Sequence, residues 1–499
     1  MKKRISNIIL GFIILITLLL FFSSQWVITT FGGVTTEEII FNLSVPQVGA
    51  NTKVIIDFIF KTIVLSIFLG YILYVIIVKD KNVTLEVDIK FKKIHFKKEI
   101  FPFSNLFKVF IVLLGFCFSF YYSFDKTGLF EFIENQGKTS ILFEEEYVEA
   151  LDTSITFENE KRNLIYIFAE SMETSYTTLE NGGTQKYNLI DGLTQLSNRY
   201  ITFSNSEKLG GLLEVPGTTW TVAGLVSQTS GLPLKMNVAG SSYRKYKTFL
   251  PSAYTLGDVL NENGYNQEII MGSEASYAGR KNYFKSHGNY KIYDLNTAIK
   301  NGKMTRDDIV WWGFDDRMLF EIAKEEALKL AAEGSSFNLT LLTADTHAED
   351  GYLSDECDIK YDEKYSNVIS CSSDLILEFV KWVQLQDFYE NTTIIIVGDH
   401  LSMDYDFFNG MDPSLVRTVY NVFINSAVST EDYKNRTITS MDLYPTTLAA
   451  MGATIEGDRL GLGTNLFSDK PTIAELYGID TFRDELEKKS VFYNERFLK

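Results

Sequence analysis

The chain has few cysteines, few histidines and a deficit of positive charge. Its 499 residues include 3 cysteines and 4 histidines, and 47 Lys and Arg stand against 64 Asp and Glu, a formal net charge of −17. A nucleic-acid partner is therefore not expected, because phosphate contacts require a basic face and the chain after residue 123 has no Lys/Arg cluster. The acidity is compatible with binding divalent cations, although many solvated surfaces are acidic.

The three cysteines fall into two groups. Cys117 lies inside an apolar run, where it behaves as a small hydrophobe. Cys357 and Cys371 flank a short polar segment in the second half of the chain. If that part is exported, a disulfide between them is expected, worth roughly 3 kcal/mol by loop entropy. Two unrelated free thiols are the alternative.

Long apolar runs occur only in the first quarter of the sequence, at residues 5–30, 54–78 and 106–122. The first exceeds the roughly 20 residues that cross a bilayer. It has neither the short apolar core nor the Ala-x-Ala-like exit of a signal peptide, so we expect a retained anchor. The sequence predicts a membrane domain over residues 1–123, a linker over 124–160 and an extracytoplasmic domain over 161–499.

The orientation follows from the basic residues. Lys2, Lys3 and Arg4 precede the first run, and seven lysines lie between the second and third runs: Lys79, Lys81, Lys90, Lys92, Lys93, Lys97 and Lys98. The positive-inside rule places both segments in the cytoplasm. Residues 31–53 and everything after about 123 are then expected outside, so the prediction is a multi-pass membrane protein.

The remainder of the chain reads as an α/β domain. Apolar runs of strand length are separated by helical stretches at 255–263, 315–332 and 373–384. The runs lie at residues 164–169, 267–272, 337–343, 393–398 and 422–425. This alternation predicts a mainly parallel sheet covered on both faces, with the functional site beyond the carboxyl ends of its strands.

Acidic and imidazole side chains follow several of these strands. Glu170 follows the first, His347 follows the third in Ala-Asp-Thr-His, and Asp399 and His400 follow the fourth. Carboxylates and imidazoles gathered at one sheet edge predict a metal site. For His287, in Lys-Ser-His-Gly, a structural role competes with a functional one.

A Gly-Thr-rich turn, Gly217-Thr218-Thr219-Trp220-Thr221, leads into a helix of small residues. Such a turn supplies a hydroxyl nucleophile and a helix N-terminus that stabilises phosphate charge. Taken alone, however, the threonines are more often N-caps than catalysts.

Together these segments resemble the phosphoglycerol transferases and lipoteichoic acid synthases of the sulfatase/alkaline-phosphatase superfamily. Their sequence motifs are most similar to those of the glucan-modifying phosphoglycerol transferase branch. The resemblance runs over about residues 160–470 and rests on Ile-Tyr-Ile-Phe-Ala-Glu-Ser, Gly-Thr-Thr-Trp-Thr-Val-Ala-Gly, Ala-Asp-Thr-His, Val-Gly-Asp-His and Gly-Asp-Arg-Leu-Gly-Leu-Gly-Thr. It implies N-terminal transmembrane helices followed by a sulfatase-like domain.

The resemblance also implies roles for individual residues. Metal ligands would be Glu170, Asp399, His400 and the nucleophilic threonine. A Ser/Thr-Gly pair lies nine and ten positions after the superfamily's nucleophile, so Ser230-Gly231 selects Thr221. Thr219 is the runner-up, because Gly-x-Thr also occurs in the family.

His347 and Arg280 would contact the phosphate or the entering hydroxyl, and His287 is a further candidate for substrate binding. The synthase branch has a tryptophan two residues before the arginine, where this sequence has Ala278. The resemblance at Arg280 therefore does not extend to the lipid-headgroup pocket of the synthase branch.

The implied activity is transfer of glycerol phosphate from phosphatidylglycerol to a cell-envelope glycan or polyglycerophosphate through a phospho-threonine, with release of diacylglycerol. The implied cofactor is one divalent cation, manganese before magnesium or zinc. A phosphoethanolamine transferase is the first alternative, although those enzymes usually carry more disulfides and more zinc-binding histidines. A sulfatase or phosphodiesterase is the second, although the Cys/Ser-x-Pro-Ser-Arg setting of sulfatases does not occur here. A non-catalytic scaffold is the third, although no metal-site residue is missing.

Overall fold

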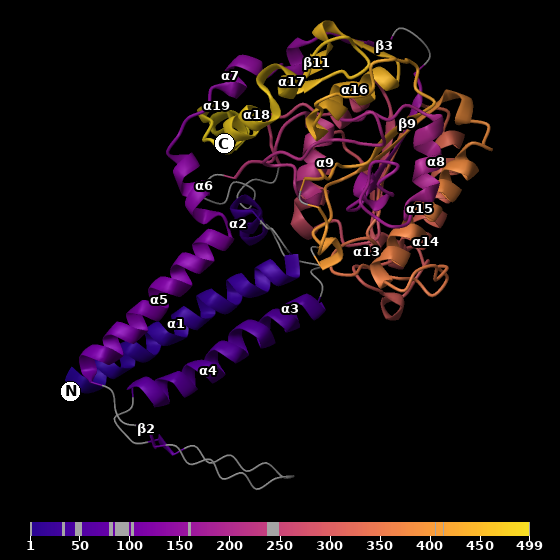
Figure 1. Cartoon of the computed structure of the whole chain (residues 1–499). Helices are drawn as coiled ribbons and strands as arrows, with labels where there is room; N and C mark the ends of the chain where they lie inside the picture. The colour runs from indigo at the N-terminus through magenta and orange to yellow at the C-terminus, as the bar shows by residue number, and fades with distance from the viewer. Residues whose placement is uncertain are drawn as a thin grey trace. The chain divides into compact units, whose positions relative to one another are not determined.

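The computed structural model describes residues 2–31, 35–44, 52–78, 83–84, 99–100, 104–157, 161–236, 249–404, 406–412 and 414–498. The chain divides into two compact units, drawn together in Figure 1. The smaller unit holds residues 1–36 and 51–133, and the larger holds 37–50 and 134–499. The larger unit thus includes a segment from between the first two apolar runs.

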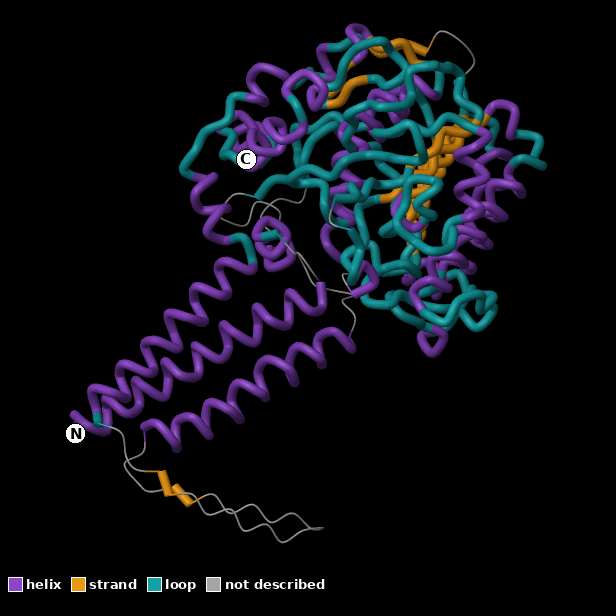
Figure 2. Tube along the Cα trace, in the orientation of Figure 1, coloured by secondary structure: helices purple, strands orange, loops and turns teal. Residues whose placement is uncertain are grey.

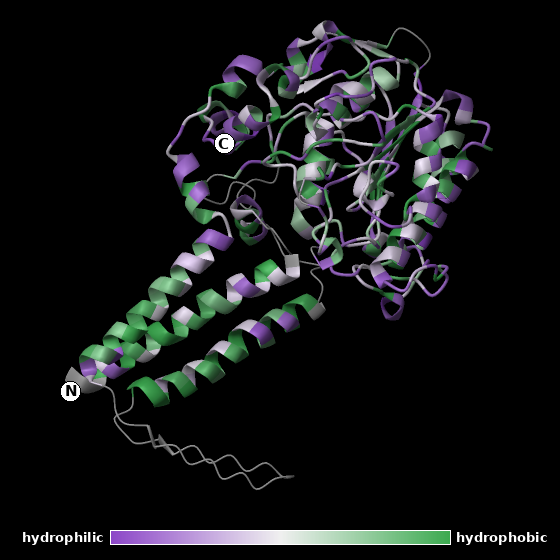
Figure 3. Ribbon diagram, in the orientation of Figure 1, coloured by the Kyte–Doolittle hydropathy of each residue, from purple (hydrophilic) through white to green (hydrophobic). Residues whose placement is uncertain are grey.

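The smaller unit is built from long apolar helices, which are mostly green in Figure 3. Its helices are α1 (Lys2–Phe31), α3 (Thr52–Phe58), a π-helical segment (Ile59–Val64), α4 (Leu65–Leu73), a second π-helical segment (Tyr74–Val78) and α5 (Asn105–Lys126). The short strands β1 (Val83–Thr84) and β2 (Glu99–Ile100) form an antiparallel pair in the same unit. By length and composition three spans can cross a membrane: Ile5–Thr30, Val54–Val78 and Asn105–Lys126. The lysines predicted to face the cytoplasm between the second and third spans lie outside the described residues.

Side-chain hydrogen bonds join these helices to one another. The hydroxyls of Ser119 and Ser123 on α5 donate to the carbonyls of Thr17 and Leu20 on α1. The Trp26 indole donates to Asp57. In an apolar surrounding such bonds satisfy polar groups that would otherwise be costly to bury.

The larger unit is organised around a six-stranded sheet of order β6-β5-β7-β4-β8-β9. Its strands are β4 (Asn163–Ala169), β5 (Asn266–Met271), β6 (Lys291–Tyr293), β7 (Phe337–Leu342), β8 (Thr392–Gly398) and β9 (Asn421–Ile424). All neighbouring pairs are parallel except β8 and the edge strand β9. The predicted mainly parallel sheet is confirmed; the three-residue edge strand β6 was not predicted.

Both faces of this sheet are covered, and strand β4 shows why. Leu164, Tyr166 and Phe168 belong to the apolar core on one face, whereas Ile165 and Ile167 belong to the core on the other. Alternate side chains of a strand point to opposite faces, so a strand that is apolar at every position is buried on both. Figure 2 shows the strands between layers of helices.

Two sets of helices form these layers. One core packs α8 (Asp191–Arg199), α14 (Asp316–Ala332) and α15 (Lys364–Val383). The other packs α9 (Thr221–Ser230), α11 (Leu256–Glu262), α12 (Arg280–Ser286) and α16 (Leu443–Ala450). The predicted helix at 373–384 starts nine residues earlier, at Lys364, where the Glu363 side chain caps its first turn.

Smaller elements complete the larger unit. They are α2 (Thr36–Ser44, from Glu37 onward), α6 (Leu129–Gln136, from Glu134 onward), α7 (Leu142–Glu146), β3 (Ile155–Phe157), α13 (Leu295–Lys300), β10 (Ala453–Ile455), β11 (Arg459–Leu460), β12 (Gly463–Thr464), α17 (Ile473–Tyr477), α18 (Ile479–Glu487) and α19 (Val491–Arg496). Strand β3 pairs with β10, so part of the segment predicted as a linker is built into this unit. Cys357 and Cys371 form a disulfide.

Candidate active site

The register of the sheet brings the two predicted ligand segments together. Strands β4 and β8 are parallel neighbours, and Ala169 at the end of β4 lies opposite Gly398 at the end of β8. The next residues, Glu170 on one strand and Asp399 on the other, therefore leave the sheet side by side. His400 follows directly, so a carboxylate from each strand and one imidazole meet at the carboxyl edge.

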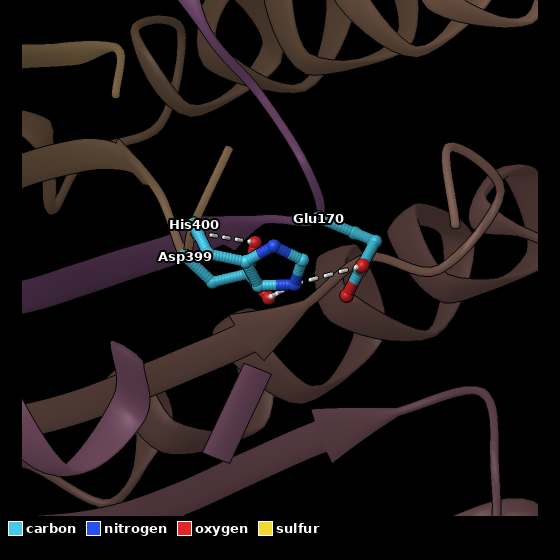
Figure 4. A group of neighbouring side chains, drawn as sticks. All are labelled: Glu170, Asp399 and His400. Atoms are coloured by element: carbon cyan, nitrogen blue, oxygen red, sulfur yellow. Dashed lines mark hydrogen bonds and ion pairs between the residues drawn. The ribbon is translucent and has the colours of Figure 1, made fainter. Parts of the chain in front are cut away.

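The side chains of Glu170, Asp399 and His400 converge in a buried cluster (Figure 4). One ligand atom from each lies within 4.8 Å of the others. His400 Nε2 lies 3.3 Å from Glu170 Oε1 and 3.4 Å from Asp399 Oδ2. Each of the three residues is no more than 3% exposed.

The fourth predicted ligand, Thr221, reaches the same cluster from α9. Its Oγ1 donates to Glu170 Oε2 at 3.3 Å and lies 3.4 Å from His400 Nε2. Thr221 is the first residue of α9, after Trp220 in extended backbone. The hydroxyl therefore lies at the positive end of a ten-residue helix, where phosphate oxygens are stabilised.

Close packing fixes α9 against the end of β8. Gln228 Nε2 donates to the Gly398 carbonyl at 2.8 Å, and Gln228 Oε1 accepts from the Tyr166 hydroxyl at 2.9 Å. A Cβ at Gly224 would lie 2.1 Å from the Asp399 carbonyl oxygen. Only glycine permits this approach, which sets the distance between Thr221 and the ligands on β8.

The donor atoms of the cluster fit a divalent cation. Asp399 Oδ1 accepts from the backbone N–H groups of Ser171 and His400, whereas its buried Oδ2 has no hydrogen-bond partner among the described residues. His400 Nδ1 lies 2.7 Å from the Leu401 carbonyl, a contact that requires the proton on Nδ1 and leaves the Nε2 lone pair to the cluster. Two carboxylates, an imidazole nitrogen and a hydroxyl suit manganese, magnesium or zinc.

The pKa values reflect negative charge crowded into this site. Burial disfavours the imidazolium of His400, yet the carboxylates of Asp399 and Glu170 outweigh it and raise its pKa well above the ordinary value. Burial also raises the pKa of Asp399, and the nearby Glu170 charge adds to this. For Glu170, the charge and hydrogen bond of His400 overcome burial and lower the pKa to about 2. Protonated His400 thus supplies positive charge to the crowded carboxylates. A bound metal ion would supply that charge instead, and its binding would displace the proton.

Two further carboxylates support the segment that follows His400, and the sequence analysis did not single them out. Glu173, fully buried, accepts from both Nε and Nη2 of Arg417, while Arg417 Nη2 also donates to the Ser402 carbonyl at 2.7 Å. Glu214 accepts from the Leu401 N–H at 2.6 Å. These bonds hold the turn that orients the His400 ring.

Arg280 and His347 both interact electrostatically with Glu170 of the cluster. Arg280 is buried, with Nη2 donating to Ser273 Oγ at 3.0 Å and to the Glu274 carbonyl at 2.9 Å. The Nε–H donates to the Tyr277 carbonyl at 3.1 Å, so the guanidinium plane is fixed and only Nη1 donates to no described residue. A phosphate would therefore be contacted through Nη1, and the two-nitrogen fork is not available.

An aromatic residue missed by the sequence analysis lies beside them. The Trp312 ring packs against the His347 ring at 5.1 Å and the Tyr277 ring at 5.4 Å, and Arg280 stacks on Tyr277 at 5.4 Å. The synthase branch has its tryptophan at the Ala278 position; in this chain an indole reaches the region from a different loop. Sequence spacing cannot reveal such a contact.

The two remaining candidates, His287 and Thr219, have different surroundings. His287 is buried, with Nδ1 3.1 Å from Asp258 Oδ2 and Nε2 2.6 Å from the Phe249 carbonyl, neither of which belongs to the cluster. Both ring nitrogens are thus engaged in holding α11 and α12 together. Thr219 Oγ1 is buried and has no hydrogen-bond partner among the described residues, whereas Thr221 Oγ1 reaches two ligands.

Known proteins resemble about half of this chain in sequence. Phosphoglycerol transferase I from Salmonella choleraesuis is 32% identical over 258 residues, 50% of this chain and 32% of the relative. The same-named protein from Citrobacter koseri is 31% identical over 262 residues, 51% of this chain and 32% of the relative. The matched region spans about a third of the length of these relatives.

Two solved structures share the fold. Lipooligosaccharide phosphoethanolamine transferase A from Neisseria meningitidis aligns with a TM-score of 0.52 at 11% identity, covering 90% of this chain and 84% of that one. The lipoteichoic acid synthase LtaP from Listeria monocytogenes aligns with a TM-score of 0.50 at 15% identity, covering 63% and 79%. The Sulfatase family model matches residues 162–453, which include every residue of the cluster, and the chain belongs to the sulfatase family.

Proposed function

We propose that the protein is a phosphoglycerol transferase, which moves glycerol phosphate from phosphatidylglycerol to a cell-envelope glycan or a polyglycerophosphate. The observation that carries the proposal is the position of Thr221, whose hydroxyl lies 3.3 Å from Glu170 and 3.4 Å from His400 at the start of α9. The 32% identity to phosphoglycerol transferase I supports the choice of substrate.

Glu170, Thr221, Asp399 and His400 would hold one divalent cation, for which we propose manganese, with magnesium or zinc as alternatives. When bound, the cation lowers the pKa of the threonine hydroxyl and neutralises phosphoryl oxygens.

The chain's own residues provide the remaining steps. Thr221 Oγ1, having lost its proton to solvent, attacks the phosphorus, and the bond from phosphorus to the diacylglycerol oxygen breaks, leaving a glycerophosphoryl-threonine. His347 donates a proton to the departing diacylglycerol oxygen, and Arg280 donates to the phosphate from Nη1. A hydroxyl of the acceptor, deprotonated by His347, then attacks the same phosphorus and releases Thr221.

The proposed setting is the outer face of a bacterial cytoplasmic membrane, with the protein crossing it three times. Three spans of sufficient length and hydropathy support this topology. A tethered domain meets a lipid phosphodiester at high effective concentration, an advantage that a soluble substrate would not need.

The test follows diacylglycerol release from phosphatidylglycerol by the purified full-length protein with added manganese. Thr221→Ala should abolish release, and Thr219→Ala should retain it. Loss with Thr219→Ala alone would move the nucleophile to Thr219. A wild-type protein that releases no diacylglycerol from phosphatidylglycerol, but turns over phosphatidylethanolamine or a soluble ester, would contradict the proposed donor.

A further inference from the structure

The peptide plane that joins Thr346 to His347 is held at both ends. At one end, the Thr346 carbonyl accepts a hydrogen bond from the Tyr365 hydroxyl at 2.7 Å. At the other end, the His347 N–H donates to the Ala344 carbonyl at 3.1 Å. Because a peptide unit is planar, these two bonds together fix the backbone from which the His347 side chain leaves.

The His347 ring is oriented within the same segment. Its Nδ1 lies 2.7 Å from the Ala348 carbonyl, a contact that requires the proton on Nδ1 and leaves Nε2 to give and take the proton in the proposed reaction. The neighbouring Thr346 hydroxyl donates to the Glu170 carbonyl. The segment that carries the proposed proton donor is therefore joined directly to a residue that carries a proposed metal ligand.

Tyr365 also reaches the segment that begins at the ligand His400. Its hydroxyl oxygen lies 2.9 Å from Ser402 Oγ. A tyrosine hydroxyl has one proton and a carbonyl can only accept, so that proton goes to Thr346 and the Ser402 hydroxyl donates to Tyr365. One hydroxyl thus ties the segment that carries His347 to the segment that carries His400.

The surroundings of Tyr365 hold this hydroxyl in place. The residue lies fully buried in the first turn of α15, and its N–H donates to Glu363 Oε1 at 2.8 Å. Its ring packs edge-on against the rings of Tyr176 and Phe407, at centroid distances of 6.4 and 5.2 Å. Burial raises the pKa of the hydroxyl, so it stays a donor at neutral pH. Because a phenylalanine ring keeps the ring contacts, Tyr365→Phe removes the bridge and not the packing.

We propose that Tyr365 is a positioning residue for the transfer reaction, whose hydroxyl holds the proton donor His347 in place relative to the ligands Glu170 and His400. The inference rests on the proposed function. Tyr365 acts through His347, because without the hydroxyl only one end of the Thr346–His347 peptide plane remains held. A proton donor must lie within about 2.6–3.2 Å of the oxygen that it protonates, so a small tilt of the imidazole removes it from reach.

The experiment measures a single turnover with the full-length protein in excess over phosphatidylglycerol, with manganese and without an acceptor. The rate constant for diacylglycerol release then does not depend on how much of the protein is folded. Tyr365→Phe should lower this rate constant about 10- to 100-fold, as expected for a displacement of up to about 1 Å at a reacting group. The double variant Tyr365→Phe/His347→Gln should be no slower than His347→Gln alone, because the effects of two residues that act through one group do not add.

The leaving group separates the positioning of a proton donor from a general loss of structure. The para-nitrophenyl ester of glycerol phosphate would form the same glycerophosphoryl-threonine, but it releases para-nitrophenolate, a stable anion that leaves without a proton. Tyr365→Phe should therefore cleave this ester at close to the wild-type rate, and so should His347→Gln. A structural defect would slow both substrates alike.

Tyr265→Phe is the matched control, because Tyr265 is 4% exposed and its hydroxyl also donates to a backbone carbonyl, that of Arg162, at 2.8 Å. Arg162 directly precedes β4, at the opposite end of the strand from Glu170. The control thus removes one buried tyrosine hydroxyl away from the site and should keep the wild-type rate on both substrates. A second variant, Ser402→Ala, breaks the bridge on its other side and should show a smaller loss of the same kind as Tyr365→Phe.

Three results would overturn the inference while leaving the proposed function intact. They are a wild-type rate of diacylglycerol release in Tyr365→Phe or Ser402→Ala, an equal loss on both substrates, and a double variant slower than His347→Gln by the full effect of Tyr365→Phe. A wild-type rate in His347→Gln would remove the proton donor itself and, with it, the inference. A wild type that released no diacylglycerol from phosphatidylglycerol would instead contradict the proposed function.

Discussion

The approach of α9 to strand β8 predicts the effect of a single added methyl group. In Gly224→Ala, the new Cβ would lie 2.1 Å from the Asp399 carbonyl oxygen and 2.9 Å from its carbon. Ordinary contacts begin near 3.4 Å, so α9 or the Asp399 segment must move by about 1 Å. Thr221 is attached to one and Asp399 to the other, so their separation must change.

The magnitudes follow from two opposing effects. Replacing glycine by alanine inside a helix would by itself stabilise by about 1 kcal/mol. Overpacking a rigid contact costs about 1–3 kcal/mol, so a net loss of stability is expected. A displacement of about 1 Å at the reacting groups should reduce diacylglycerol release about 100-fold.

Thermal unfolding, manganese titration and diacylglycerol release on the full-length protein check these effects together. The matched control is Gly115→Ala on α5, where an added Cβ meets nothing within 4 Å. That variant should be at least as stable as the wild type and equally active. A Gly224→Ala protein with wild-type manganese affinity and activity would refute the proposed link between this contact and the site.

Two further predictions concern stability. Replacing Cys357 and Cys371 by serine opens a loop with a sequence separation of 14 and should cost about 3 kcal/mol, measured by thermal unfolding; reductant should shift the wild type equally and leave the double variant unchanged. Burial raises the pKa of Glu268 to about 7, so the folded state binds its proton more tightly than the unfolded chain, and stability should fall as pH rises from about 4.5 to 7. Lys291 pairs with Glu268 and Glu326 at 3.0 and 2.9 Å, so Lys291→Met should deepen that fall, with a larger loss of unfolding midpoint at pH 8 than at pH 5; an equal loss at both would contradict this.

Much of the fold could be predicted because its central strands are buried on both faces. Strand β4 is buried at all seven positions, and such a strand leaves a continuous apolar run in the sequence. The edge strand β6, with the exposed Lys291 and the partly exposed Ile292, leaves no such pattern. The metal ligands could be predicted for the same reason, since Glu170, Asp399 and His400 directly follow two of the buried strands.

Other parts of the site depend on contacts that local sequence does not encode. Trp312 reaches the region from a loop that does not lie at the end of a predicted strand. His287 illustrates the reverse, because a histidine that bridges Asp258 and a backbone carbonyl looks the same in sequence as one that binds substrate. Only tertiary placement separates these cases.

The most direct test of the account is to look for the covalent intermediate itself. The full-length protein, incubated with phosphatidylglycerol and manganese without an acceptor, is quenched in acid, digested and analysed by mass spectrometry. We predict a glycerophosphoryl group on Thr221, which disappears when a glycan acceptor is added. A modified Thr219, or diacylglycerol release with an unmodified Thr221, would contradict the claim that Thr221 is the nucleophile.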